Sequence, residues 1–222
     1  MKSLISVLLV VIFLHISAGL LAQTFGLKGG YTLSDLLLKE DGESVSDEFG
    51  MKSGFHFGPT LEWEISEGAG FETALLLTTK GIKMDETETY EGISYSSNAK
   101  VNLYYLDIPL MGKLYADVGN ARIYGMLGPY VGIGLSGKTK VEEKGGSETY
   151  DEEWDIEWGS GDEDDLKRLG FGMAVGGGVE INSLIFEFSS HFGLNNISPQ
   201  SDYDMVARNR TFMFSVGYKF HQ

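Results

Sequence analysis

Hydrophobic and polar positions alternate through most of the chain, and the alternation is clearest near its end, at residues 211–220. One parity of that stretch carries only bulky apolar side chains: Phe212, Phe214, Val216, Tyr218 and Phe220. The other parity is small or polar. Successive side chains of a β-strand point to opposite faces, so the stretch predicts a strand with one apolar face. A terminal strand leaves a free edge unless it is paired. We therefore predict that it closes a barrel whose outer face is apolar and meets lipid.

Seven further segments show the same alternation. They cover residues 25–33, 54–65, 70–83, 98–115, 121–137, 167–181 and 184–194. Long polar connections are expected at 34–53, 84–97, 138–165 and 195–207, and short turns at 66–69, 117–120 and 182–183. Eight strands with alternating long and short connections are typical of outer-membrane barrels, which have short periplasmic turns and long external loops. The predicted fold is all-β, an eight-stranded antiparallel transmembrane β-barrel.

The N-terminus predicts export. Lys2 precedes an apolar run at 4–14, and small residues follow up to Ala22, as in a secretory signal peptide. We predict a signal peptide over residues 1–22 and a single barrel domain over 23–222; an uncleaved membrane anchor is the alternative. Lys2 is the only Lys, Arg, Asp or Glu in residues 1–22, so cleavage changes the net charge from −15 to −16. This acidity argues against nucleic-acid partners. The absence of cysteine excludes disulfides, zinc–thiolate sites and a lipoprotein anchor.

Charged and histidine side chains gather on the parity opposite the apolar faces. An eight-stranded barrel has an interior just wide enough for side chains to fill, and charges are tolerated there when they are paired or hydrated. We predict a structural charge network that plugs the lumen, with a narrow proton or ion path and catalysis as alternatives. Its predicted members are Lys28, His56, Glu62, Glu72, Lys80, Asp107, Lys113, Glu180, Glu187, His191 and Lys219.

One stretch matches a nucleotide-binding motif. Gly132, Gly137, Lys138 and Thr139 fit the P-loop pattern G-x-x-x-x-G-K-[ST]. A P-loop is followed by a helix, whereas here the chain continues as KVEEKGG and keeps the strand period before the motif. We interpret the match as chance and predict no cofactor.

Two other features leave alternatives open. Residues 142–165 hold twelve acids and suit either a divalent cation or a solvated, repelling loop, although the spacing does not fit an EF-hand. Trp154 and Trp158 in this segment indicate a contact surface. A hydrolase site built from His56, Glu187, Ser189 and His191 is a further alternative, but the chain lacks G-x-S-x-G and H-E-x-x-H motifs. We predict no metal site.

Several segments resemble the outer-membrane β-barrel proteins of Bacteroidetes, the PorT-like group. The similarity is carried by GLKGGYTLSDL (26–36), GFHFGPTLEWEIS (54–66), YLDIPLMGKLY (105–115), YGMLGPYVGIGLSGK (124–138) and NRTFMFSVGYKF (209–220). The Ala22–Gln23 junction is similar to signal cleavage sites common in that phylum. The resemblance implies an eight-stranded barrel in the outer membrane. It implies little about activity, because a barrel hosts many functions.

The sequence therefore predicts a non-enzymatic integral outer-membrane barrel. Its expected partners are outer-membrane lipid and, at the acidic external loops, proteins or polysaccharides; its oligomeric state stays open. The alternatives are a component of a secretion or gliding machinery, an outer-membrane enzyme, and a soluble lipocalin-like barrel. The last of these predicts apolar side chains inside and polar ones outside, the reverse of the pattern seen here.

Overall fold

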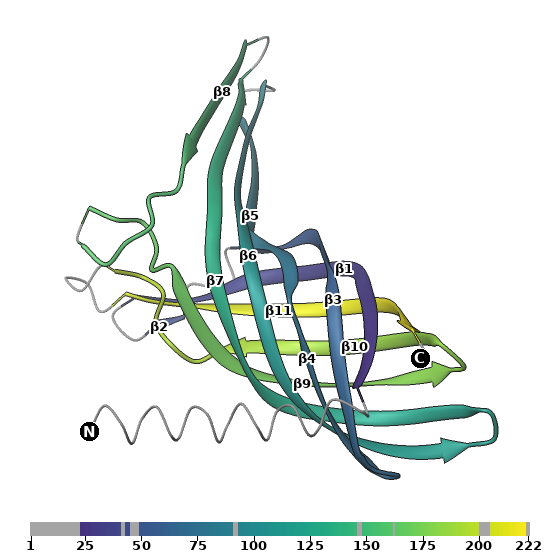
Figure 1. Cartoon of the computed structure of the whole chain (residues 1–222). Coiled ribbons are helices and arrows are strands. Elements are labelled where there is room, and N and C mark those ends of the chain that lie inside the picture. Colours follow the sequence, from purple (N-terminus) through teal and green to yellow (C-terminus); the bar gives the residue numbers. More distant parts are fainter. Residues whose placement is uncertain are drawn as a thin grey trace, which may run out of the picture.

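The computed structural model describes residues 23–40, 43–44, 49–90, 93–145, 148–161, 163–199 and 205–220. The predicted signal peptide lies outside these ranges, and within them no helix is long and apolar enough to cross a membrane. The described chain forms one eleven-stranded antiparallel sheet (Figure 1). Its strands are β1 (Gln23–Glu40), β2 (Glu43–Ser44), β3 (Gly50–Ser66), β4 (Ala69–Ala74), β5 (Leu76–Tyr90), β6 (Ile93–Val118), β7 (Ala121–Gly145), β8 (Glu148–Asp155), β9 (Leu169–Ile181), β10 (Leu184–Gly193) and β11 (Val206–Phe220).

The sheet closes on itself through β1. This strand pairs with β3 on one side and with β11 on the other, so that Phe25 lies opposite both Leu61 and Phe220. The order around the ring is β1, β3, β4 with β5, β6, β7, β9, β10, β11 and back to β1. The prediction that the last strand closes a barrel is confirmed. Closure pairs the backbone edges that an open sheet would leave exposed.

The short connections are two-residue turns at 67–68, 119–120 and 182–183, where the pattern predicts short turns. Gly119 has φ 63° and Asn182 has φ 55°. Glycine enters this left-handed region without a Cβ clash, and asparagine tolerates it better than most residues. The Lys219 backbone N–H donates to the Ser183 carbonyl at 2.8 Å. The end of β11 therefore lies beside the turn between β9 and β10.

One residue, Leu75, separates β4 from β5. In the register of the neighbouring strands it lies opposite Pro59 on β3 and Ile108 on β6, the residue before Pro109, and neither proline has an N–H to give to the ladder. The Leu75 N–H still donates to the Pro59 carbonyl at 3.0 Å. The register is unbroken across the gap, because Thr73 pairs with Leu110 and Leu76 with Asp107. The interruption thus lies at Leu75, on the strand beside Pro109.

The two faces of the barrel differ in chemistry. In β10, Phe186 and Phe188 are exposed, whereas Glu187 and Ser189 are buried. β11 alternates in the same way from Thr211 to its end. The apolar parity therefore faces outward and the charged parity inward, as predicted. A lipocalin-like barrel would show the reverse.

Long strands replace much of the predicted external loops. β5 continues to Tyr90 and β6 already begins at Ile93, so most of the loop expected at 84–97 is strand. β7 runs to Gly145 and β8 pairs beside it, so the loop expected at 138–165 is largely a hairpin. β1 also extends to Glu40 into the loop expected at 34–53. These predictions were wrong because a strand beyond the apolar band needs backbone pairing but no apolar face.

β5 pairs with β3 up to Lys83, and residues 84–90 of β5, 93–99 of β6, 138–145 of β7 and the whole of β8 form a four-stranded extension of the sheet. Figure 1 shows these strands extending well beyond the other strands of the barrel. A register shift at Tyr104 and Tyr105 marks where β6 and β7 leave the barrel wall. The extension is thus a continuation of the wall and shares its hydrogen bonding.

Candidate functional site

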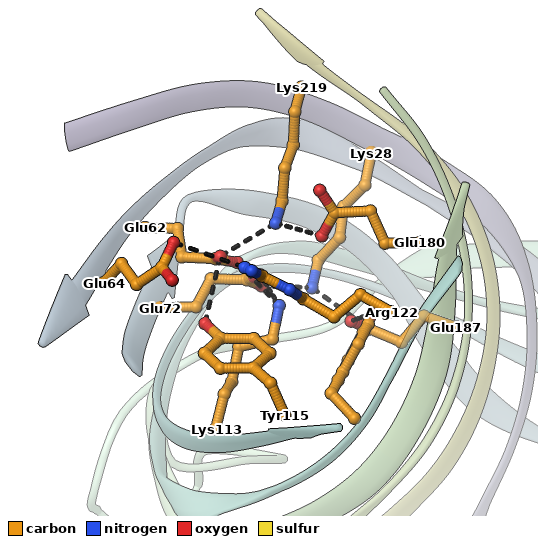
Figure 2. A network of polar contacts seen from close by, with 11 residues as sticks. Lys28, Glu62, Glu64, Glu72, Lys113, Tyr115, Arg122, Glu180, Glu187 and Lys219 are labelled. Atoms are coloured by element: carbon orange, nitrogen blue, oxygen red, sulfur yellow. Dashed lines mark hydrogen bonds and ion pairs between the residues drawn. The ribbon is translucent and has the colours of Figure 1, made fainter. Parts of the chain in front are cut away.

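A network of ion pairs crosses the interior at the end of the barrel that carries the short turns. Figure 2 shows its side chains converging from strands on all sides of the ring. Lys113 Nζ lies 2.7 Å from Glu62 and 2.8 Å from Glu72, and Lys28 Nζ lies 2.8 Å from Glu72 and 2.9 Å from Glu187. Each of these two lysines therefore bridges two glutamates that lie on different strands.

A third lysine extends the network to the last strand. Lys219 Nζ contacts Glu62 at 2.8 Å and also pairs with Glu180 (Figure 2). Three ammonium groups thus bridge four carboxylates, from β1, β3, β4, β6, β9, β10 and β11. Buried charges are tolerated when paired and hydrogen-bonded, and this arrangement supplies both.

Tyrosines complete the hydrogen bonding of the carboxylates. The Tyr115 hydroxyl donates to Glu62 at 3.0 Å, and the Tyr124 hydroxyl donates to Glu187 at 2.8 Å. Lys113 Nζ lies 4.0 Å from the centre of the Tyr124 ring, a favourable cation–π geometry. Tyr124 fits because the facing Gly178 leaves room: a Cβ there would lie 2.6 Å from the Tyr124 hydroxyl. The inward glycines of β9 therefore accommodate large neighbours.

A second ion pair lies apart from this network. Lys80 Nζ contacts Asp107 at 2.8 Å, and both side chains are fully buried. The rings of Tyr105 and Tyr130 flank the ammonium group, at 4.6 and 5.2 Å from their centres. The sequence places Lys80 and Asp107 on the inward parity but gives no signal that they pair only with each other.

The two predicted histidines are buried, and neither forms an ion pair with another residue that the structure describes. The His56 Nε2 lies 2.8 Å from the Ser215 hydroxyl, and the His191 Nε2 lies 3.4 Å from the Ser189 hydroxyl. The hydrolase alternative needs an acid that orients the imidazole. Glu187 instead binds Lys28 and Tyr124. The contacts therefore do not connect Ser189, His191 and Glu187 as a triad.

A small cavity lies beside these groups. A cavity of about 10 Å³ lies between the network and the histidines. This volume is at the lower limit for holding one water molecule. Its lining residues are Lys28, Leu76, Pro109, Met111, Met126, Glu187, Ser189, His191, Met213 and Ser215.

The opposite end of the interior holds an apolar cluster that the sequence analysis missed. Strand residues meet residues from the connecting segments there: Leu36, Leu38, Ile82, Leu103, Tyr105, Leu166, Ile197 and Ala207. Trp158 packs edge-on against Tyr105, with ring centres 5.6 Å apart. We predicted Trp158 as part of an exposed contact surface, and its half-buried position contradicts that. The sequence signal that could have predicted this cluster is the presence of apolar residues such as Leu166 and Ile197 within polar segments.

The P-loop-like residues lie on β7. They occupy one continuous strand, with no helix after Thr139. Packing explains the glycines: a Cβ on Gly134 would lie 2.3 Å from the Trp158 ring, and one on Gly132 would lie 2.7 Å from an Asp107 oxygen. Lys138 pairs with Glu153 and lies 3.7 Å from Asp155. These residues therefore form part of the wall and the extension.

Two carboxylates of the acidic segment accept hydrogen bonds from backbone N–H groups of the same segment. Asp164 accepts the Gly161 N–H at 2.7 Å, and Asp165 accepts the Glu157 N–H at 2.9 Å. In the part of the chain that the structure describes, no three His, Asp or Glu side chains are grouped as metal ligands. In the exposed extension, the hydrogen bond from Lys138 lowers the pKa of Glu153 and raises that of the lysine.

The chain is similar to several proteins of known structure. The chain is similar to Ail, the attachment invasion locus protein of Yersinia pestis, with 15% identity over 90% of this chain and 99% of that one, and a TM-score of 0.36. OprG from Pseudomonas aeruginosa gives 16% identity over 90% and 97%, with a TM-score of 0.39. Neisserial surface protein A gives 14% over 88% and 97%, also at 0.39.

No curated protein matches the chain. A family model described as "Outer membrane protein beta-barrel domain" matches residues 21–198, which is most of the chain. The closed antiparallel ring, with its apolar outside and charged inside, is consistent with that match. The chain therefore belongs to the outer membrane protein beta-barrel domain family, whose place is the outer membrane.

Proposed function

We propose that this protein is a closed, non-enzymatic outer-membrane barrel that carries an external acidic extension for contacts with partners. We count β4 and β5 as one strand interrupted at Leu75. On this count eight strands enclose the lumen, and lipid covers the exposed apolar band. Residues 1–22 serve as the signal peptide for export. The short turns then lie on the periplasmic side and the extension on the outside.

The filled interior carries this proposal. Lys28, Lys113 and Lys219 bridge carboxylates across one end, and the cluster around Tyr105 and Trp158 fills the other. A water-filled pore needs a continuous polar path, and both layers interrupt such a path. The buried lysines and glutamates act as structural groups because each ammonium already has a carboxylate partner.

Planar-bilayer recording tests the closed lumen. The reconstituted full chain is expected to give no stable conductance, whereas a porin in the same bilayers supplies the positive control. A reproducible open state from the wild-type protein would contradict the proposal.

N-terminal sequencing of the exported protein tests the signal peptide, and Gln23 is the expected first residue.

Membership of the PorT-like group stays a prediction. It rests on the quoted segments, among them the Tyr-Leu-x-Ile-Pro element at 105–109. A role in a secretion or gliding machinery would require stable association with other components of such a machine. Crosslinking in intact cells followed by purification measures that association directly.

A further inference from the structure

β8 is the outermost strand of the extension and has one open edge. Among the described residues it pairs with β7 alone. The Ile156 N–H donates to the Gly137 carbonyl at 2.9 Å, and opposite pairs in an antiparallel ladder alternate between bonded and non-bonded. The pair Lys138–Asp155 is therefore non-bonded. It follows that the backbone groups of residues 149, 151, 153 and 155 point away from β7.

The protection of this edge against another strand is of one sign of charge. Natural edges are blunted by charged side chains, especially lysine, and by proline, a bulge or a covering segment, and β8 has only the acidic side chains. β8 contains no proline or lysine, and its register with β7 is continuous. Residues 149–155 are all exposed. The edge is therefore open to a further strand.

The side chains along this edge define what can bind. Five of the eight residues of β8 are acidic and none is basic. Asp151, Glu153 and Asp155 lie on one face. Tyr150 and Trp154 lie on the other face, on either side of Glu152, and are 57% and 45% exposed. Exposed aromatic side chains of this kind supply much of the binding energy at interfaces.

A second copy of this chain is a poor occupant. Antiparallel pairing of two β8 edges sets acidic strands side by side, and like charges directly opposite one another are destabilising. The same charges attract a basic strand. The edge thus disfavours self-association and favours one class of partner.

We propose that β8 takes an extended segment of another protein as an additional strand, in which basic residues alternate with apolar or aromatic ones. Its basic residues lie beside Asp151, Glu153 and Asp155, and its apolar residues beside Tyr150 and Trp154. Backbone hydrogen bonds supply the affinity and the alternation supplies the specificity, as in other cases of strand addition. This inference rests on the proposed external contact function and names its partner class.

Binding of synthetic peptides to the full chain in detergent micelles tests the proposal. The probe is a fluorescent peptide of about the length of β8 in which lysine alternates with valine. One control peptide has the same composition with its lysines and valines in separate blocks. A second control is the alternating peptide with N-methyl groups on alternate residues, which removes half of its backbone donors. Only the unmodified alternating peptide is expected to raise the fluorescence anisotropy at low micromolar protein.

Two variants locate the site. Asp151→Pro removes an outward N–H that β7 does not use, and proline is tolerated at such edge positions. It is expected to weaken binding at least about tenfold, since strand addition loses backbone hydrogen bonds. Asp151→Asn keeps the backbone and is expected to weaken binding only at low salt. Asp85→Asn, on β5 at the far side of the extension, is the matched control and should bind like wild type.

Three results would overturn the proposal. These are equal binding to Asp151→Pro, equal binding of the block peptide, and no binding of the alternating peptide to the wild-type chain. A β8-mediated dimer, detected by mass measurement in micelles, would also overturn it by showing the edge occupied by a second copy. Conductance of the same preparations reports on the closed lumen separately, so the two proposals fail independently.

Discussion

Lys113 illustrates how a single residue is satisfied inside the barrel. Its side chain has no exposure, and its ammonium group contacts Glu62, Glu72 and the Tyr124 ring. Removing one partner of a buried ion pair leaves an uncompensated charge in a low-dielectric interior, which costs more than the pair contributes. Residues of this kind are therefore the sensitive points of the interior.

The variant Lys113→Met tests this sensitivity. We expect a loss of about 3 kcal/mol in the free energy of unfolding, at the lower end of the range for broken buried pairs. The expected loss is low in this range because, in the variant, Glu62 still pairs with Lys219 and Glu72 still pairs with Lys28. Urea unfolding in lipid vesicles measures it. Arg122→Gln is the control, since Arg122 pairs with Glu64 and Asp117 in partly exposed positions and should cost at most about 1 kcal/mol.

Gly134→Ala tests the packing of Trp158 over the wall. The added methyl group collides with the Trp158 ring, and overpacking of this kind costs about 1–3 kcal/mol. We expect faster amide exchange in residues 156–166 and a barrel that still assembles. Gly125→Ala is the control, because a Cβ there meets nothing within 4 Å. Equal exchange in both variants would contradict the packing.

The inward positions of the charged residues could be predicted from the sequence, but their partners could not. Strand parity places Lys219 and Glu62 on the inside, yet these two residues are 157 positions apart in the chain. Which charges meet depends on the stagger between strands all around the ring. For the same reason, the sequence could not predict the pairing of Lys80 with Asp107 or the apolar cluster around Trp158.

At the level of elements, the strands divide into a part in the apolar band and a part beyond it. β11 alternates exposed apolar and buried residues from Thr211 to Phe220. The ends of β5, β6 and β7 keep the ladder without that alternation. Periodicity therefore predicted the strands that form the ring and their order, with β4 and β5 as one strand, but it missed β2 and β8 and placed the outer ends of several strands many residues too early.

Arginine substitutions along β11 test the depth of the apolar band. Val216→Arg lies near the middle of the exposed apolar stretch, where an arginine facing lipid costs about 2–4 kcal/mol. Phe220→Arg lies at its end and should cost about 1 kcal/mol or less. Folding yield into vesicles, read from heat-modifiable migration on gels, measures the difference. Equal yields for the two variants would argue against lipid on this face.

Acid is expected to loosen the hairpin of β7 and β8. Lys138 lowers the pKa of Glu153, and Lys144 lowers that of Glu142 in the same way. A carboxylate whose pKa is lower in the folded state contributes stability that is complete above its unfolded pKa and is lost as the pH falls through the folded value. Amide exchange in residues 148–155, corrected for intrinsic rates, should therefore accelerate at acidic pH. Lys138→Gln should show a weaker pH dependence, and an unchanged dependence would contradict this role of the pair.

At the level of the whole molecule, the described residues combine an apolar outside, an inside that holds ion pairs and an apolar cluster, and an extension on one side. The outer-membrane barrel predicted from the alternation is confirmed by the family match and by the closed sheet. Hydropathy averaged over the chain could not give this result, because apolar and charged residues alternate within the same strands. The shape of the extension could not be predicted, since it depends on backbone pairing between polar segments.

An accessibility scan of β11 tests the central claim most directly. The chain has no native cysteine, so single cysteines carrying a spin label can be placed one at a time from Thr211 to Phe220. In lipid vesicles, labels on the Phe212 parity should be accessible to oxygen, and labels on the Thr211 parity should be shielded from both oxygen and a water-soluble nickel complex. The predicted result is an oscillation with a period of two residues. Nickel access along the inward parity would reveal a water-filled lumen and contradict the account.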